Sequence, residues 1–203
     1  MLSRVLLVLV TALAGLAGIV TATYFIPVSV MLGPCMKDWT SPNSYSRRAS
    51  PLASQELHVQ GGAIKVCYGR PSARGRTVFG ELVPFGRYWR LGANEPTRLF
   101  TSVPLEVAGV AIPPGRYSLY ALPDRYRWEI AINRSTFHWG TDFSDRVLAR
   151  EVGRSEVYSQ PVPEPVDTLT LTLRHTIGLS QPVLTIEWEQ TRVEVQMVVR
   201  KAE

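Results

Sequence analysis

Apolar and polar residues alternate along most of the chain from residue 56 onward. In residues 168–173 leucines alternate with threonines, and in residues 184–189 large apolar residues alternate with threonine and glutamate. The same period recurs in residues 64–68, 128–132 and 193–199. A period of two places one face of a strand in a core and the other face in water. The pattern therefore predicts β-strands, and outside the N-terminal segment no window shows a helical period.

Turn residues separate these predicted strands. They are Gly61-Gly62, Pro113-Pro114-Gly115, Pro123-Asp124 and the stretch from Gly178 to Pro182. About nine or ten short antiparallel strands fit this spacing, which is typical of a β-sandwich. The sequence predicts an all-β domain over residues 56–203, an antiparallel β-sandwich or jelly-roll-like fold. The Ser- and Pro-rich stretch 37–55 is predicted to be a linker.

The N-terminal segment is apolar and carries no charged residue from Val5 to Met36. A spanning helix needs about 20 apolar residues, whereas the apolar core of a secretory signal has about 7–15. Residues 5–26 are therefore predicted to be a transmembrane helix, within an anchor and juxtamembrane segment of residues 1–36. The alternative is a cleaved signal peptide, because small residues near Ala22 offer a cleavage position.

Small residues recur every four positions in this predicted helix, at Ala14, Gly18 and Ala22. Such a ridge lets another membrane helix approach closely. The alternative is that alanine and glycine are simply frequent in membrane helices. An anchor near the start followed by an all-β domain is a common arrangement in export, so we expect residues 37–203 to lie outside the cytoplasm.

Composition and charge narrow the choice of partners. The chain has 203 residues, enough for one domain and an appendage, and its 45% hydrophobic content supplies a core. The 22 basic and 17 acidic residues form no Lys/Arg run, which argues against nucleic acid as a partner. The basic surplus is concentrated in residues 70–98, with six arginines against two glutamates.

The residues that usually bind metals or act in catalysis are scattered. His58, His138 and His175 have no partner at a ligand spacing, so no metal site and no cofactor are expected. No nucleophile stands beside a base in a recognisable motif, and the sequence favours a protein that is not an enzyme. For Cys35 and Cys67 we favour two unpaired thiols; the alternative is a bridge that ties the juxtamembrane segment to the first hairpin.

The alternation fails between Tyr68 and Phe100, where glycines and large aromatic residues predict a long loop. A loop of about thirty residues in a compact domain is usually functional or packed by its own side chains. Four aromatic residues are the expected anchors of this loop on the sheet: Phe79, Phe85, Tyr88 and Trp89.

A series of short sequence motifs, in this loop and on both sides of it, resembles the bacterial family called domain of unknown function 2911. They include Ala49-Ser50-Pro51, residues 68–72, Arg74-Gly75-Arg76, residues 78–80 and 82–86, Trp89-Arg90, residues 92–95, residues 114–119 and Trp139-Gly140. The resemblance covers about residues 49–195 and implies an exported bacterial β-rich domain. It brings no reaction or ligand. A signal peptide or lipid anchor is commoner in that family than a long helix, so this N-terminus departs from its usual pattern.

Two interpretations apply to the polar residues of the loop. The candidate ligand-binding residues are Arg70, Arg74, Arg76, Arg90, Asn94 and Glu95. In the first interpretation their guanidinium groups bind an anion or carboxylate bidentately, with Asn94 and Glu95 orienting it. In the second, which we favour, they hydrogen-bond loop carbonyls and pair with Glu81 and Glu95, and so fix a loop without ladder bonds.

Two functions follow as expectations. The first is a non-enzymatic accessory subunit of a membrane protein complex, such as a respiratory or photosynthetic assembly, held in the bacterial inner membrane by one helix with its β-domain in the periplasm. Its expected partners are the lipid bilayer, through residues 5–26, and other subunits. The alternative is a periplasmic module for a small anionic ligand, or a hydrolase, that uses the arginine-rich loop 70–98.

Overall fold

The computed structural model describes residues 35, 48–176, 178 and 181–201. The predicted membrane helix 5–26, its small residues Ala14, Gly18 and Ala22, and residues 37–47 of the predicted linker lie outside the described residues. Within the described part of the chain, no helix has the length and apolar character needed to cross a membrane.

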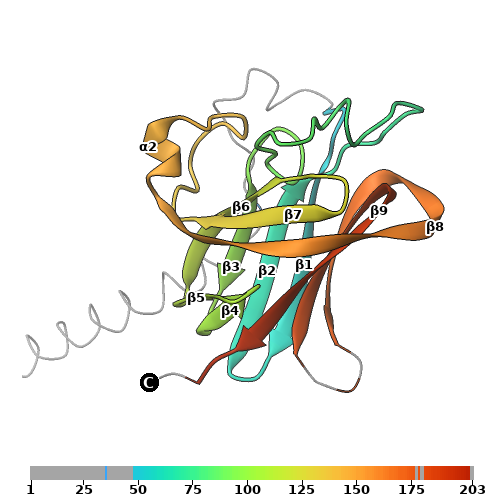
Figure 1. Ribbon diagram of the computed structural model, residues 1–203. Helices are drawn as coiled ribbons and strands as arrows, with labels where there is room; N and C mark the ends of the chain where they lie inside the picture. Colours follow the sequence, from blue (N-terminus) through green and yellow to red (C-terminus); the bar gives the residue numbers. More distant parts are fainter. Residues whose placement is uncertain (1–34, 36–47, 177, 179–180, 202–203) are drawn as a thin grey trace, which may run out of the picture.

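Nine antiparallel strands, with almost no helix, make up the regular secondary structure of the described residues (Figure 1). The strands are β1 Leu52–Val59, β2 Gly62–Gly69, β3 Thr97–Thr101, β4 Leu105–Val107, β5 Val110–Ile112, β6 Gly115–Leu122, β7 Arg127–Asn133, β8 Glu151–His175 and β9 Pro182–Val199. A single short helix, α2 Asp145–Leu148, accompanies them in the described residues. The all-β prediction is confirmed.

The strands form one continuous sheet in the order β1-β2-β3-β6-β7-β8-β9-β4-β5. Two separate sheets were expected, and the difference comes from β8 and β9, which have 25 and 18 residues. Figure 1 shows both strands, in orange and red, bending as they cross the molecule. The pairing of β8 with β9 shifts register between Pro161 and Val166 and again before Thr170. Because they bend, β8 and β9 connect the strands β1-β2-β3-β6-β7 on one side to β4-β5 on the other within a single sheet.

The sheet folds back on itself and encloses the core. The second half of β8 lies against β2, where the amide of Leu171 donates a 3.1 Å hydrogen bond to the Tyr68 hydroxyl. The alternating residues predicted to face inward are buried, among them Leu169, Leu171, Leu184, Ile186 and Trp188. Burying such side chains contributes about 1.5–3 kcal/mol each, so this alternation is what makes the folded sheet stable.

The strand β1 begins at Leu52, inside the segment that the sequence predicts to be a linker. Residues 52–55 pair with β2 from Gly69 to Val66 and therefore belong to the sheet. Their Ser and Gln residues suit an edge strand, because one of its faces remains in water.

The two ends of the folded sheet differ. At one end, which we call the loop end, lie the start of β1, the loop of residues 70–96 and the β6–β7 turn of residues 123–126. At the opposite end lies the β1–β2 turn at Gln60-Gly61, beside Arg200 near the C-terminus. In Figure 1 the loop end is at the top and the β1–β2 turn at the bottom.

Candidate functional site

Aromatic side chains anchor the 70–96 loop on the core. Phe79 lies 5.1 Å from Trp128, and Trp89 stacks on Trp188 at 6.0 Å, both measured between ring centroids. Aromatic pairs at these distances contribute about 0.5–1.5 kcal/mol beyond the area they bury. The predicted anchoring role of Phe79 and Trp89 is confirmed, and Trp89 also exchanges two backbone hydrogen bonds with Ala121 of β6.

The other two predicted anchors occupy the rim of the loop. Tyr88 packs on Tyr120 and Phe143, with ring centroids 5.5 and 5.2 Å away. Phe85 lines a cavity that is described below.

The first polar feature of the loop is a buried ion pair with the segment that precedes β1. The Arg48 guanidinium donates two hydrogen bonds to the Glu95 carboxylate, one of 2.9 Å from Nη1 to Oε1 and a shorter one from Nη2 to Oε2. Only 8% of the Arg48 side chain and 2% of the Glu95 side chain are exposed. This buried bidentate pair holds together two segments that are 47 residues apart in the sequence.

The residues after Arg48 are held in the same way through their backbone. Three consecutive carbonyls accept hydrogen bonds from the loop: Ala49 O from Arg74 Nη2 at 3.3 Å, Ser50 O from Asn94 Nδ2 at 3.4 Å, and Pro51 O from the Arg70 amide at 2.8 Å. We call Arg70, Arg74, Asn94 and Glu95 the clasp. The clasp contacts each residue of segment 48–51, so the approach of the chain to β1 is fixed at the loop end.

A disulfide attaches a second point of the N-terminal chain to the same region. Cys35 is bonded to Cys67, with 5.7 Å between the Cα atoms. Cys67 lies in β2 opposite Ser54 of β1, two residues before β2 ends and the loop begins. The favoured prediction of two unpaired thiols is therefore wrong, and the bridged alternative is the one observed.

Arg90 lies beside the Arg48–Glu95 pair and is half-buried. Burial lowers the pKa of its guanidinium, and the charge of Glu95 opposes that effect. The Arg90 Nε atom is buried and has no hydrogen-bond partner among the described residues. The Glu95 carboxylate thus lies near two cations, and its charge compensates both.

Gly140 packs closely against the backbone of Asn94 in the clasp and against the side chain of Arg90. A Cβ atom at Gly140 would lie 2.3 Å from the carbonyl oxygen of Asn94 and 2.4 Å from Arg90 Cδ. Contacts this short do not occur, so the segment around Trp139-Gly140 reaches the clasp only because residue 140 has no side chain.

We expect Gly140→Ala to lower the free energy of unfolding by about 1–3 kcal/mol, because the new methyl group must displace backbone of the clasp. Urea unfolding measures the change. Gly153→Ala is the matched control, since its nearest neighbour is a methyl group of the Val110 side chain at 3.0 Å and not backbone. Equal costs for the two substitutions would contradict the role assigned to Gly140.

The side chains of Arg70 and Arg76, two of the predicted site residues, hydrogen-bond other parts of the chain. Arg70 donates from Nε to Leu169 O and from Nη2 to Thr170 Oγ1, both at 3.2 Å. Arg76 donates to the carbonyls of Ala73 and Ser72 at 2.9 and 3.0 Å. These are the contacts of the structural interpretation, whereas ligand binding by these residues stays a prediction.

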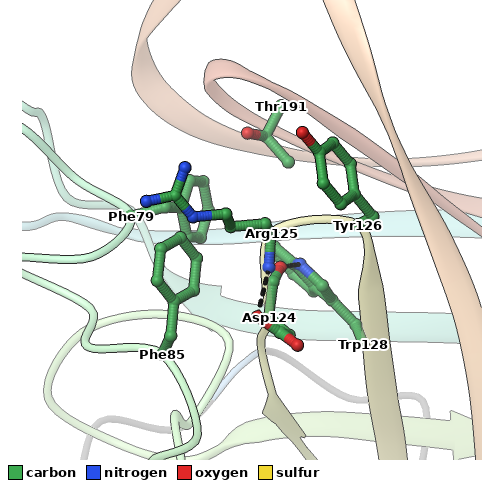
Figure 2. A pocket seen from close by; sticks show the side chains of 7 residues that line it. All are labelled: Phe79, Phe85, Asp124, Arg125, Tyr126, Trp128 and Thr191. Atoms are coloured by element: carbon green, nitrogen blue, oxygen red, sulfur yellow. Dashed lines mark hydrogen bonds between the residues drawn. The ribbon is translucent and has the colours of Figure 1, made fainter.

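The loop end also contains a cavity of about 330 Å³, which lies between the 70–96 loop, the β6–β7 turn and β9. Its lining consists of Phe79, Phe85, Asp124, Arg125, Tyr126, Trp128 and Thr191. Figure 2 shows the Arg125 side chain extended across the cavity toward Phe79 and Phe85, with Tyr126 and Thr191 on the other side.

The carboxylates near this cavity are engaged with backbone amides. Asp124 Oδ1 accepts a 2.7 Å hydrogen bond from the Arg125 amide, and the Asp124 carbonyl accepts one of 3.0 Å from Trp128 Nε1. Glu189 accepts hydrogen bonds from the amides of Val78 and Phe79 at 3.2 and 3.3 Å. These bonds shape the turn and the loop around the cavity.

The sequence pattern does not predict this cavity. Pro123-Asp124 marks only a turn, although the Arg-Tyr-Arg run at 125–127 follows at once. A turn that presents an aromatic residue between two arginines was the available signal, because Tyr and Arg are enriched in binding surfaces. The described residues contain no group of three or more His, Cys, Asp or Glu that could hold a metal ion.

Comparison with known proteins identifies one relationship. Residues 50–197 match the model of a family described as "Protein of unknown function (DUF2911)". No curated protein and no solved structure matches the chain.

Proposed function

This chain belongs to the DUF2911 family, and we propose that it is a non-enzymatic accessory subunit of a membrane protein complex, anchored by residues 5–26 with its β-domain in the periplasm. In this proposal the folded sheet is a rigid β-sandwich body that the N-terminal helix holds against a partner. The observation that carries the proposal is the fixation of the N-terminal segment at the loop end, by the clasp and by the Cys35–Cys67 disulfide.

The position of Cys35 limits how far the domain can move from the predicted helix. Residues 27–34 separate the two, and fully extended they span at most about 30 Å. A tether of this length attached at the loop end keeps that end close to the bilayer. The disulfide supports a location outside the cytoplasm, because such bonds persist in oxidising compartments.

The surface of the loop end has the composition of a contact region. Leu82, Tyr126 and Tyr158 are 41%, 75% and 68% exposed. Arg125 and Arg127 lie beside the two tyrosines, since Arg127 pairs with Tyr158 in the sheet. Tyrosine and arginine are enriched in protein interfaces, where they supply both apolar area and hydrogen bonds. A neighbouring subunit at the membrane would meet this surface first.

Cross-linking in native membranes tests the proposal. A photo-reactive amino acid replaces Leu82 at the loop end or, as the control, Gln60 at the opposite end, and the membranes are then solubilised mildly. We expect the chain to co-purify with other membrane proteins, and Leu82 to cross-link to one of them far more than Gln60. A lone monomer with no cross-link from Leu82, or a mature chain that begins at Thr23, would refute it.

A further inference from the structure

We propose that the cavity at the loop end binds a small ring-bearing carboxylate, with the ring between aromatic side chains and the carboxylate on Arg125. This proposal does not depend on the role in a membrane complex, although Arg125 and Tyr126 also belong to the surface assigned to that role. It also differs from the predicted ligand residues of the clasp, whose polar groups bind segment 48–51.

The size and the lining of the cavity indicate that the ligand is a small molecule with one ring. A volume of about 330 Å³ lies at the lower end of the range for small-molecule sites, about 300–1,000 Å³, and suits one ring with short substituents. Phe79 is held by its contact with Trp128, so this wall is preformed. Phe85 comes from the loop and Tyr126 from the β6–β7 turn. Flat aromatic faces favour a ring that can stack on them.

The positive charge of Arg125 indicates that the ligand carries an anionic group. Among the described residues, no hydrogen bond or ion pair engages the Arg125 guanidinium, and Figure 2 shows it extended into the cavity. Asp124, the acid in the lining, is held by the Arg125 amide, and Glu189 behind Phe79 is held by two loop amides. The cation that reaches across the cavity is therefore left for a ligand.

The geometry of a guanidinium selects the kind of anion. Its planar fork matches a carboxylate through two parallel hydrogen bonds, which are stronger than neutral ones. The hydroxyl groups of Thr191 and Tyr126 lie on the other side of the cavity and can orient polar substituents of the ring. Both aromatic acids and sugar acids offer this chemistry, and the experiment separates them.

Calorimetric titration of the full-length chain tests the site with four probes. Benzoate is the aromatic ring carboxylate, glucuronate is the sugar carboxylate, acetate has the charge without a ring, and benzyl alcohol has a ring without the charge. We expect benzoate or glucuronate to bind, and acetate and benzyl alcohol to bind at least about tenfold more weakly. Binding by benzoate alone identifies an aromatic acid, and binding by glucuronate alone a sugar acid.

Two variants decide whether the binding occurs in this cavity. Arg125→Gln should weaken binding at least about tenfold, since a charge-assisted hydrogen bond is lost. Arg127→Gln is the matched control, because its guanidinium pairs with Glu156 at 3.3 Å, and binding should be unchanged. Failure of both ring carboxylates to bind, equal binding of benzyl alcohol, or equal effects of the two variants would overturn the proposal.

Discussion

Replacing Glu95 with alanine is expected to lower the free energy of unfolding by about 3–5 kcal/mol, because it leaves buried guanidinium charge without compensation. Arg48 is almost completely buried against Glu95, and Arg90 lies beside the pair with its pKa already lowered by burial. Urea unfolding measures the loss. The substitution also frees segment 48–51 at its first residue, so proteolysis before β1 should become faster.

An exposed ion pair provides the matched control for Glu95. Arg127 and Glu156 lie 3.3 Å apart with more than half of each side chain exposed, and Glu156→Ala should cost less than about 1 kcal/mol. The double variant Arg48→Met with Glu95→Leu should recover part of the loss, since it removes both charges of the pair. A Glu95→Ala variant as stable as Glu156→Ala would show that the pair does not hold the segment.

The second large effect is expected from the disulfide. Cys35 and Cys67 are 32 residues apart, and closing a loop of this length stabilises a fold by about 3–4 kcal/mol through the entropy of the unfolded chain. We expect Cys35→Ser to lower the free energy of unfolding by that amount, measured in urea. The buried Cys67 thiol that remains packs as a small apolar group.

Reductant separates this effect from a general loss of packing. Reducing conditions should destabilise the wild-type chain to the level of Cys35→Ser and leave that variant unchanged. If reductant lowers the free energy of unfolding of both proteins equally, or of neither, the disulfide does not supply the stability assigned to it.

The sequence predicted the strands where alternation was unbroken. Leu169, Leu171, Leu184 and Ile186 face the core as the period of two requires. The single long strand β8 was not predictable, because proline cannot donate to a ladder and usually ends a strand. The register of β8 shifts after Pro161, so the prolines lie where the ladder is interrupted and the strand continues past them.

The candidate site was predictable in its residue types and not in its partners. Arginines in a glycine-rich loop were expected to bind loop carbonyls and to pair with Glu81 and Glu95. Arg74 instead binds the carbonyl of Ala49, and Glu95 pairs with Arg48. The groups they bind lie in segment 48–51, which polar composition marked as a linker. Local pattern carries no information on contacts between residues far apart in the sequence, and for the same reason the pairing of Cys35 with Cys67 was only the less favoured alternative.

The distance of each end of the β-domain from the membrane surface is the measurement that tests the central claim most directly. That claim is that the N-terminal segment is fixed at the loop end. The full chain is placed in lipid nanodiscs with a fluorescent amino acid at Leu82 or at Gln60, and energy transfer to a headgroup-labelled lipid is recorded. We predict stronger transfer from Leu82, and a smaller difference when Cys35→Ser and Glu95→Ala are combined. Equal transfer from both positions, or stronger transfer from Gln60, would contradict the account.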